Sequence, residues 1–391
     1  MSSARLPGTP RLLRALNDRA ALELLLSRGP LTRAQLGELT GLSKVTASQL
    51  VERLEERGLV ARVGEQAGGR GPNAQMYAVV PATAFVVGVE AGPAHVVAGV
   101  ADITGNIVGR TDVAIGDGDD PVKVVHAAVI EAATAAGAPI ERIRRIVLGT
   151  PGLVDPKSGE ITFAWDLPRW HRGLLTALRD DLNRPVMFEN DVNLAAIAEQ
   201  HSGAAVGAQD FVLVWLDRGV GTAVVLGGRL HRGSVGAAGE IGYLPVAGTQ
   251  VTRDASRRSK SGFRTLVDAA AVRAIAKTHG FKSTGAAADA VRAAIAAGTA
   301  GSPFLDELAR RISLGVASVG LVLDPELVVL AGEIGQAGGA DLAQRVQHEV
   351  AAIAVVSPRV VATEVASEPV LHGAILTGLD AVREEVFGST A

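Results

Sequence analysis

The sequence predicts an α/β protein in two parts: a small helical head with a β-hairpin over residues 1–80, and a larger two-lobed body over residues 81–391. Three observations support this division. Amphipathic helical stretches and a glycine-rich hairpin fill the head, and two similar sets of short strands occur in the body. A group of polar residues also lies at a strand-to-helix junction near the middle of the chain.

The distribution of charge separates the same two parts. Residues 1–80 hold 11 Lys and Arg against 7 Asp and Glu, whereas the rest of the chain holds 27 against 34. A basic head on an acidic body favours a polyanion partner for the head alone. No apolar run reaches the roughly 18 residues of a membrane helix, and no secretory signal begins the chain. We therefore expect a cytoplasmic protein without a membrane partner.

The head contains three stretches with helical spacing. Leucines and alanines recur at this spacing over residues 11–27, Thr32 can cap a second helix ending near Leu39, and Ser43 can cap a third helix ending near Arg57. The positions expected to face the core in the second and third helices are Ala34, Leu36, Leu39, Val45, Leu50, Val51 and Leu54.

The second and third helices have the spacing of a helix-turn-helix, in which the later helix presents its first turns to the major groove of DNA. Short polar groups and one cation occupy those turns, and such groups can reach base edges or phosphates. The candidate DNA-binding residues are Ser43, Lys44, Thr46, Ala47, Ser48 and Gln49.

Two strand-like runs, 59–63 and 75–80, enclose a glycine-rich tip that carries Arg70. An arginine at such a tip can enter a minor groove or bind phosphate. Helices followed by this hairpin are typical of a winged helix-turn-helix domain. The alternative is a helical protein-docking module with an incidental hairpin.

The body contains two sets of three short strands joined by turns, which suggests duplicated α/β lobes. The first set is predicted at 85–89, 96–100 and 106–110, and the second at 211–216, 221–226 and 229–231. Further strands are predicted at 145–149 and 326–330, and helices at 122–136, 305–323 and 371–387. We expect lobe one to comprise residues 84–188 with the C-terminal helix 371–391, and lobe two to comprise residues 189–370.

The polar group ENDVN at 189–193 follows an apolar run and precedes a helical one. Desolvated carboxylates and amides need partners or a cleft, and α/β proteins bind ligands at such junctions. The simpler interpretation is that Asn190 or Asp191 only caps the following helix.

Four ordered segments, together with the winged head, resemble the ROK family of repressors and sugar kinases. They are GTPGLVD at 149–155, ENDVN at 189–193, GEIGY at 239–243 and LDPELVVLAG at 323–332. The resemblance covers essentially the whole chain and implies a two-lobed actin/hexokinase-like fold for the body. It places Asp191 at the position of the kinases' catalytic base, and Asn190 and Glu240 among the groups that bind sugar hydroxyls. Gly152 would let a sugar approach the backbone closely.

The departures from the family pattern concern phosphate and metal. The family's first phosphate loop reads Asp-x-Gly-Gly-Thr, whereas this chain reads EAGPA at 90–94, and proline removes a backbone donor. Tyr243 stands where the family's zinc site has a histidine, and the three later cysteines are absent. We therefore expect no metal, no cofactor and no catalytic residue. Arg264 could favour a phosphorylated or acidic sugar, although a solvated basic loop is the simpler interpretation.

These features predict a sugar-responsive transcriptional regulator of carbohydrate genes, most simply a repressor. The expected partners are operator DNA, a sugar, amino-sugar or sugar-phosphate effector, and a second copy of the chain, because helix-turn-helix proteins read paired half-sites. The proposed effector site comprises Gly152, Asn190, Asp191, Glu240, Tyr243 and Arg264. The alternatives are an ATP-dependent sugar kinase that also binds DNA, and a repressor that responds to no ligand.

Overall fold

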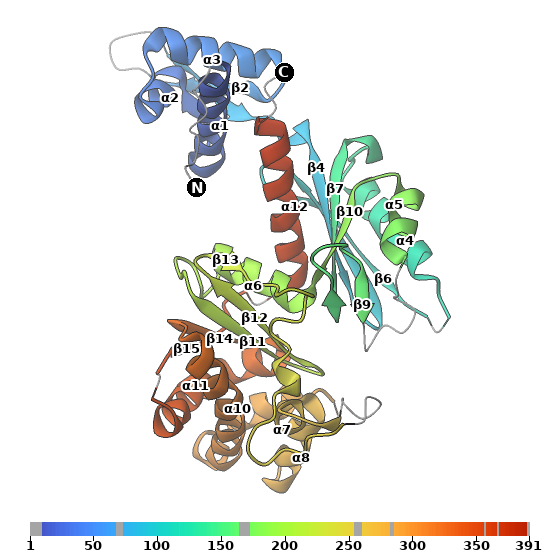
Figure 1. Ribbon diagram of the computed structural model, residues 1–391. Helices are drawn as coiled ribbons and strands as arrows, with labels where there is room; N and C mark the ends of the chain where they lie inside the picture. Colours follow the sequence, from blue (N-terminus) through green and yellow to red (C-terminus); the bar gives the residue numbers. More distant parts are fainter. Residues whose placement is uncertain are drawn as a thin grey trace, which may run out of the picture.

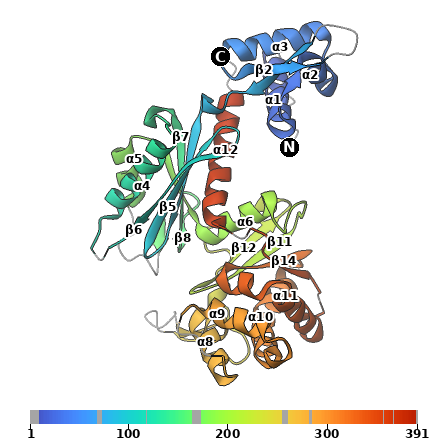
Figure 2. The same cartoon turned by 180° about the vertical axis from the view of Figure 1, so that it is seen from behind.

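The computed structural model describes residues 10–67, 73–116, 118–163, 173–253, 260–281, 285–355, 357–365 and 367–388. It shows a head and two lobes, with one long C-terminal helix running from the head past lobe one to lobe two (Figures 1 and 2). No helix among the described residues combines the length and apolar character needed to cross a membrane.

The head has the predicted order of elements. Its helices are α1 (Pro10–Arg28), α2 (Arg33–Thr40) and α3 (Lys44–Glu56), and its strands are β1 (Leu31–Thr32), β2 (Val60–Gln66) and β3 (Ala74–Val79). The strands form one sheet in the order β1-β3-β2. Thr32 is the N-cap of α2 and forms a capping box with Gln35. The Thr32 hydroxyl accepts from the backbone N–H of Gln35 at 3.2 Å, and the Gln35 side chain accepts from the backbone N–H of Thr32. Ser43 caps α3 as predicted.

Three residues predicted to face the head's core are exposed instead. Val45 is 68% exposed and Leu39 is 40% exposed, and Ala34 is also on the surface. The buried stripe of α3 consists of Ala47, Leu50, Val51 and Leu54. Apolar spacing fixes the relative positions of side chains on a helix, whereas the neighbouring elements decide which face is covered. This prediction was therefore wrong at the start of α3 and at both ends of α2.

Lobe one contains a five-stranded sheet in the order β10-β7-β4-β5-β6. Strands β4, β5 and β6 form an antiparallel meander, while β7 and β10 run parallel to β4. Its elements are η1 (Pro81–Thr83), β4 (Phe85–Ala91), β5 (His95–Asp102), β6 (Ile107–Ala114), α4 (Pro121–Ala135), η2 (Ile140–Arg142), β7 (Ile143–Thr150), β8 (Leu153–Val154), β9 (Ile161–Phe163), α5 (Leu174–Leu182) and β10 (Val186–Asn190).

Lobe two repeats this topology with its own sheet, in the order β13-β12-β11-β14-β15. Strands β11, β12 and β13 form the meander, and β14 and β15 run parallel to β11. Its elements are α6 (Asp191–Ser202), β11 (Phe211–Leu216), β12 (Val220–Leu226), β13 (Arg229–Leu230), η3 (Ile241–Tyr243), α7 (Arg264–Val267), α8 (Ala269–Thr278), α9 (Ala287–Ala296), η5 (Gly298–Ala300), α10 (Ser302–Leu323), β14 (Leu327–Ala331), α11 (Gly332–Ile353) and β15 (Arg359–Ala362). The two meanders predicted from the sequence are confirmed.

The last helix, α12 (Pro369–Gly388), connects all three parts of the molecule. It packs closely on α6, since a Cβ placed on Gly373 would lie 1.9 Å from the carbonyl oxygen of Leu194. Further along, Leu379, Val382 and Phe387 share one buried cluster with apolar residues of α1, α2 and α3. The head therefore has no separate core, and its packing continues into the body through α12.

Candidate functional site

The strand-to-helix junction at 189–193 combines a helix cap with a cavity wall. Asn190 is the N-cap of α6, because its Oδ1 accepts from the backbone N–H of Asn193 at 3.1 Å. Its Nδ2 donates to the carbonyl oxygen of Gly152 at 3.0 Å, which ties α6 to the turn after β7. Asn190 therefore caps the helix, as the simpler interpretation predicted, and it also lines a cavity.

Glu189 has a different environment from its neighbours. Its side chain is buried, accepts from Asn193 Nδ2 at 2.9 Å and pairs with Arg232 Nε at 2.7 Å. This carboxylate joins β10, α6 and the segment after β13. Its bonds support the junction, and the residue is not part of the cavity lining.

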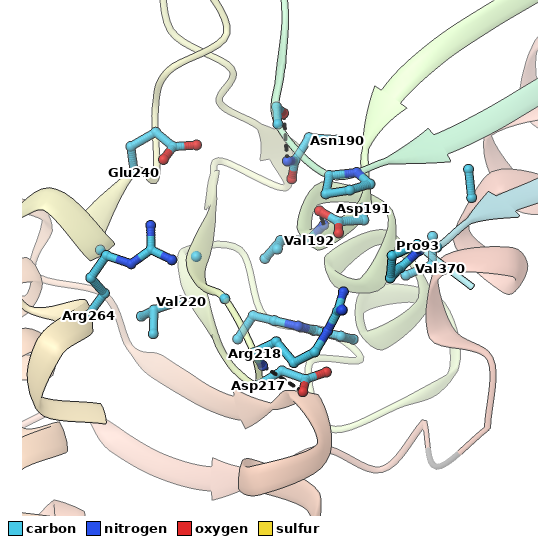
Figure 3. A pocket seen from close by; sticks show the side chains of 18 of the residues that line it. Pro93, Asn190, Asp191, Val192, Asp217, Arg218, Val220, Glu240, Arg264 and Val370 are labelled. Carbon is cyan, nitrogen blue, oxygen red and sulfur yellow. Dashed lines mark hydrogen bonds between the residues drawn. The ribbon is translucent and has the colours of Figure 1, made fainter. Parts of the chain in front are cut away.

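A cavity of about 240 Å³ lies between the two lobes. The structure brings together all six residues proposed from the sequence as an effector site, and Figure 3 shows four of them, Asn190, Asp191, Glu240 and Arg264, around one space. The six are Gly152, Asn190, Asp191, Glu240, Tyr243 and Arg264. They come from the β7–β8 turn, the start of α6, the η3 segment and the start of α7. Segments separated by more than a hundred residues therefore meet at this point.

The cavity also contains residues that the sequence analysis did not propose as ligand-binding. Among them are Glu90, Trp215, Asp217, Arg218 and Val370. Asp217 and Arg218 belong to a turn between β11 and β12. The glycines of this turn could have indicated from the sequence that it lines a binding site. Val370 had no comparable signal, because only the fold brings the first turn of α12 to the cavity.

Carboxylates crowd this cavity, and the crowding changes their acidity. Burial, followed by repulsion from Asp191 and Glu368, raises the pKa of Glu90 to about 7. Burial and then Asp191 also raise the pKa of Glu240, against the opposing effect of Arg264. The pKa of Asp217 is raised mainly by burial. A ligand that donates hydrogen bonds would relieve this repulsion, as a polyol can.

Two arginines extend into the same space. Arg264 projects from the start of α7 beside Glu240, and Arg218 projects from the turn after β11 (Figure 3). The Nε of Arg264 is buried and has no hydrogen-bond partner among the described residues. Arg264 is partly buried at the start of α7 and lines the cavity, and it does not lie in a solvated loop.

The loop that resembles a phosphate loop in lobe one is closed by its own strand pair. The backbone N–H of Gly92 donates to the carbonyl oxygen of His95 at 2.9 Å, and Pro93 has no N–H. Two of the backbone donors that could cradle a phosphate in this loop are therefore used or missing. Among the described residues, no group of three histidine, aspartate or glutamate side chains is placed to hold a metal ion.

The candidate DNA-binding residues lie at the start of α3, with one correction. Ser43, Lys44 and Gln49 are exposed, and Thr46 and Ser48 are partly exposed. Ala47 is only 1% exposed, because it lies on the buried face of α3 and packs against Gly37 of α2. It cannot touch DNA, so its assignment to the reading surface was wrong. Arg70 lies outside the described residues.

Comparisons with known proteins agree with this arrangement. Residues 86–382 match the model of the ROK family, and residues 16–71 match that of the MarR family. The chain is 25% identical over 344 residues to the DNA-binding transcriptional dual regulator NagC of Escherichia coli K12, covering 84% of this chain and 83% of NagC. It is 26% identical over 243 residues to the xylose repressor of Bacillus subtilis strain 168, covering 60% and 61%.

Two solved structures share the fold. A ROK family transcriptional regulator, a homolog of the E. coli MLC protein, aligns with a TM-score of 0.75 at 20% identity over 96% of this chain and 98% of its own. The ROK hexokinase from Thermus thermophilus aligns with a TM-score of 0.63 at 26% identity. The alignment covers 77% of this chain and 99% of the hexokinase. The regulator alignment includes the head, and the ROK family model spans the body from β4 into α12. The chain belongs to the ROK family.

Proposed function

We propose that this protein is a sugar-responsive transcriptional regulator that binds operator DNA through its head and a sugar in the cavity between its lobes. One observation carries the proposal: α12 contacts both the cavity and the buried core of the head. Val370, in its first turn, lines the cavity, and Phe387, near its end, is buried in the core of the head. A ligand that changes the packing of α12 therefore acts on the head directly.

The cavity supports a polyhydroxyl ligand. Amide and carboxylate groups from both lobes converge there, and such groups bind neighbouring hydroxyls in pairs. NagC and the xylose repressor are regulators by name, and the xylose repressor's name points to a sugar. We infer an effector of the sugar, amino-sugar or sugar-phosphate class. The simplest mode of regulation is repression of the target genes that is released when the effector binds.

The joint between head and body supports coupling of the two sites. Arg57, which follows α3, donates to the carbonyl oxygen of Val386 at 3.2 Å. Arg383 donates from Nε and Nη2 to the carbonyl oxygen of Ile103 in lobe one, at 3.1 and 3.0 Å. A sugar that closes the lobes would shift α12 and hence the spacing of two heads in a dimer. Couplings of this kind usually change affinity about 5-fold to 150-fold.

The test is operator affinity measured by fluorescence anisotropy with a panel of pentoses, hexoses, amino sugars and their phosphates. We expect one class to change the operator Kd at least about fivefold, and Asn190→Ala to abolish the change. Asp289→Asn, an exposed position on α9, is the control and should respond as the unmodified chain does. An operator Kd that no sugar alters, in a protein that binds a sugar, would contradict the proposal.

A second function, sugar phosphorylation, is favoured by the position of Asp191. This carboxylate lines the cavity close to the 217–221 turn of lobe two. A carboxylate beside a hydroxyl can draw its proton toward a phosphoryl acceptor. The bonded Gly92 and the proline after it argue against a bound triphosphate. Phosphoryl transfer from ATP to the same sugar panel separates the two, and turnover that disappears in Asp191→Asn would establish the kinase.

A further inference from the structure

Val45 stands apart from the other apolar residues of α3. It lies in the first turn, directly after Lys44, and is 68% exposed. Successive helical residues are rotated by about 100°. Val45 is therefore on the side opposite the buried stripe formed by Ala47, Leu50 and Leu54. Among the described residues of the head, Val45 belongs neither to the buried cluster nor to the apolar residues packed against it. Valine is also a weaker helix former than alanine or lysine.

The charges on α3 show which part of its outer face can approach DNA. Lys44 lies in the first turn, and the helix N-terminus adds a partial positive charge. The same face carries the exposed acidic residues Glu52 and Glu56 in its C-terminal half. Phosphates repel these carboxylates, although Glu52 lies 3.9 Å from Arg33, so the first two turns are the part of α3 best suited to enter a groove. Val45, Ser48 and Gln49 are the outward side chains of those turns.

The position of α3 in the molecule agrees with this orientation. The helix lies along the side of the head turned away from both lobes in two opposite views (Figures 1 and 2). Its outer face is therefore accessible to a duplex without any movement of the body.

Among the features that base pairs present in the major groove, one is apolar: the C5 methyl group of thymine. We propose that Val45 packs against a thymine methyl in each half-site and is a specificity-determining residue of the head. The inference rests on the DNA-binding function proposed above. Val45 suits this contact because its β-branched side chain has one strongly preferred rotamer in a helix. Its methyl groups therefore keep a fixed position relative to Gln49, which can read a neighbouring base by hydrogen bonds.

The experiment begins with selection of duplexes from a randomised pool by the full chain and by Val45→Ala. We expect the full chain to enrich a site with a thymine in each half, and Val45→Ala to enrich the same site without preference at that position. Each such thymine is then replaced by deoxyuridine, which removes only the methyl group. The replacement should weaken binding by the unmodified chain about fourfold per half-site, as expected for loss of one buried methyl-sized contact, and leave binding by Val45→Ala within about 1.5-fold.

Two controls keep the result interpretable. Val322→Ala removes an exposed valine in α10, and it should retain full sensitivity to deoxyuridine. Thermal unfolding of Val45→Ala should match the unmodified chain, because the side chain is exposed. If no duplex is enriched at all, the DNA-binding function itself fails. If a site is enriched but deoxyuridine affects the chain and Val45→Ala equally at every thymine, only the role of Val45 is overturned.

Discussion

The two lobes share one strand order, but the loops that face each other across the cavity differ. In lobe one, the turn after β4 is closed by the bond from Gly92 to His95 and contains Pro93. In lobe two, the corresponding turn after β11 directs Arg218 into the cavity, and Gly239 precedes Glu240 on the same wall. The turn of lobe one therefore has a bonded or missing donor at two successive positions, whereas the corresponding turn of lobe two presents a charged side chain to the cavity. Conservation of a sheet therefore says little about which chemistry its loops retain.

The largest expected effect distinguishes the glycines of the two lobes. Gly239 has φ +94°, and an added Cβ would lie 1.8 Å from the carbonyl oxygen of Thr222. Gly92 has no positive φ, and its added Cβ would lie 3.4 Å from the nearest atom. We expect Gly239→Ala to lower the free energy of unfolding by roughly 3 kcal/mol or more. Gly92→Ala should change it by less than about 0.5 kcal/mol. Urea denaturation of both variants is the measurement, and equal losses would remove the contrast between the loops.

The next effect concerns the carboxylate at the centre of the cavity. Asp191→Asn keeps an oxygen that can accept from the Val192 N–H but removes the charge. Hydrogen bonds to a charged group contribute about 1.5–3 kcal/mol. The Kd of the effector should therefore rise roughly 10-fold to 100-fold. Thermal shift with increasing sugar measures the change. An unaltered Kd would place the sugar away from α6.

A third effect depends on pH and tests the lobe-one side of the cavity. The pKa of Glu90 in the folded protein is about 7, above its ordinary value of 4.5, so the folded state binds the proton more tightly. Stability should then fall as pH rises from about 4.5 to 7, by at most about 3 kcal/mol. Glu90→Gln cannot ionise and should lose most of this slope, becoming more stable than the unmodified chain above pH 7.

Melting temperatures of both proteins from pH 5 to 8 measure this slope. Glu38→Gln, an exposed position on α2, is the matched control and should keep it. An identical slope in Glu90→Gln would show that other carboxyl groups carry the pH dependence.

The smallest expected effect is that of Pro93→Gly, which should not make the protein bind nucleotide. Pro93→Gly restores a backbone N–H to the turn after β4, but Gly92 remains bonded to His95. We expect no measurable increase in affinity for the magnesium complex of a non-hydrolysable ATP analogue, and a loss of stability of about 0.4–1 kcal/mol from greater freedom of the unfolded chain. Equilibrium dialysis provides the test. Micromolar binding by this variant would mean that the proline alone had blocked nucleotide.

Local signals predicted much of the fold and of the cavity. Strand periodicity and glycine turns located both meanders, and the polar junction located Asn190 and Asp191. The sequence alone could not distinguish a helix cap from a cavity-lining residue at Asn190, because the same side chain has both roles. Val370 depended on where α12 begins, which no local pattern encodes, whereas Glu90 opens the EAGPA segment that the family resemblance had already singled out. Ala47 and Val45 were assigned to the wrong faces of α3, because their burial is set by α2 and not by their own helix.

Calorimetric titration of one protein preparation with the two classes of ligand tests the central claim most directly. We expect saturable binding of a sugar that Asp191→Asn weakens, and no binding of the magnesium complex of a non-hydrolysable ATP analogue, with or without that sugar. Tight binding of the nucleotide analogue, strengthened by the sugar, would contradict the account.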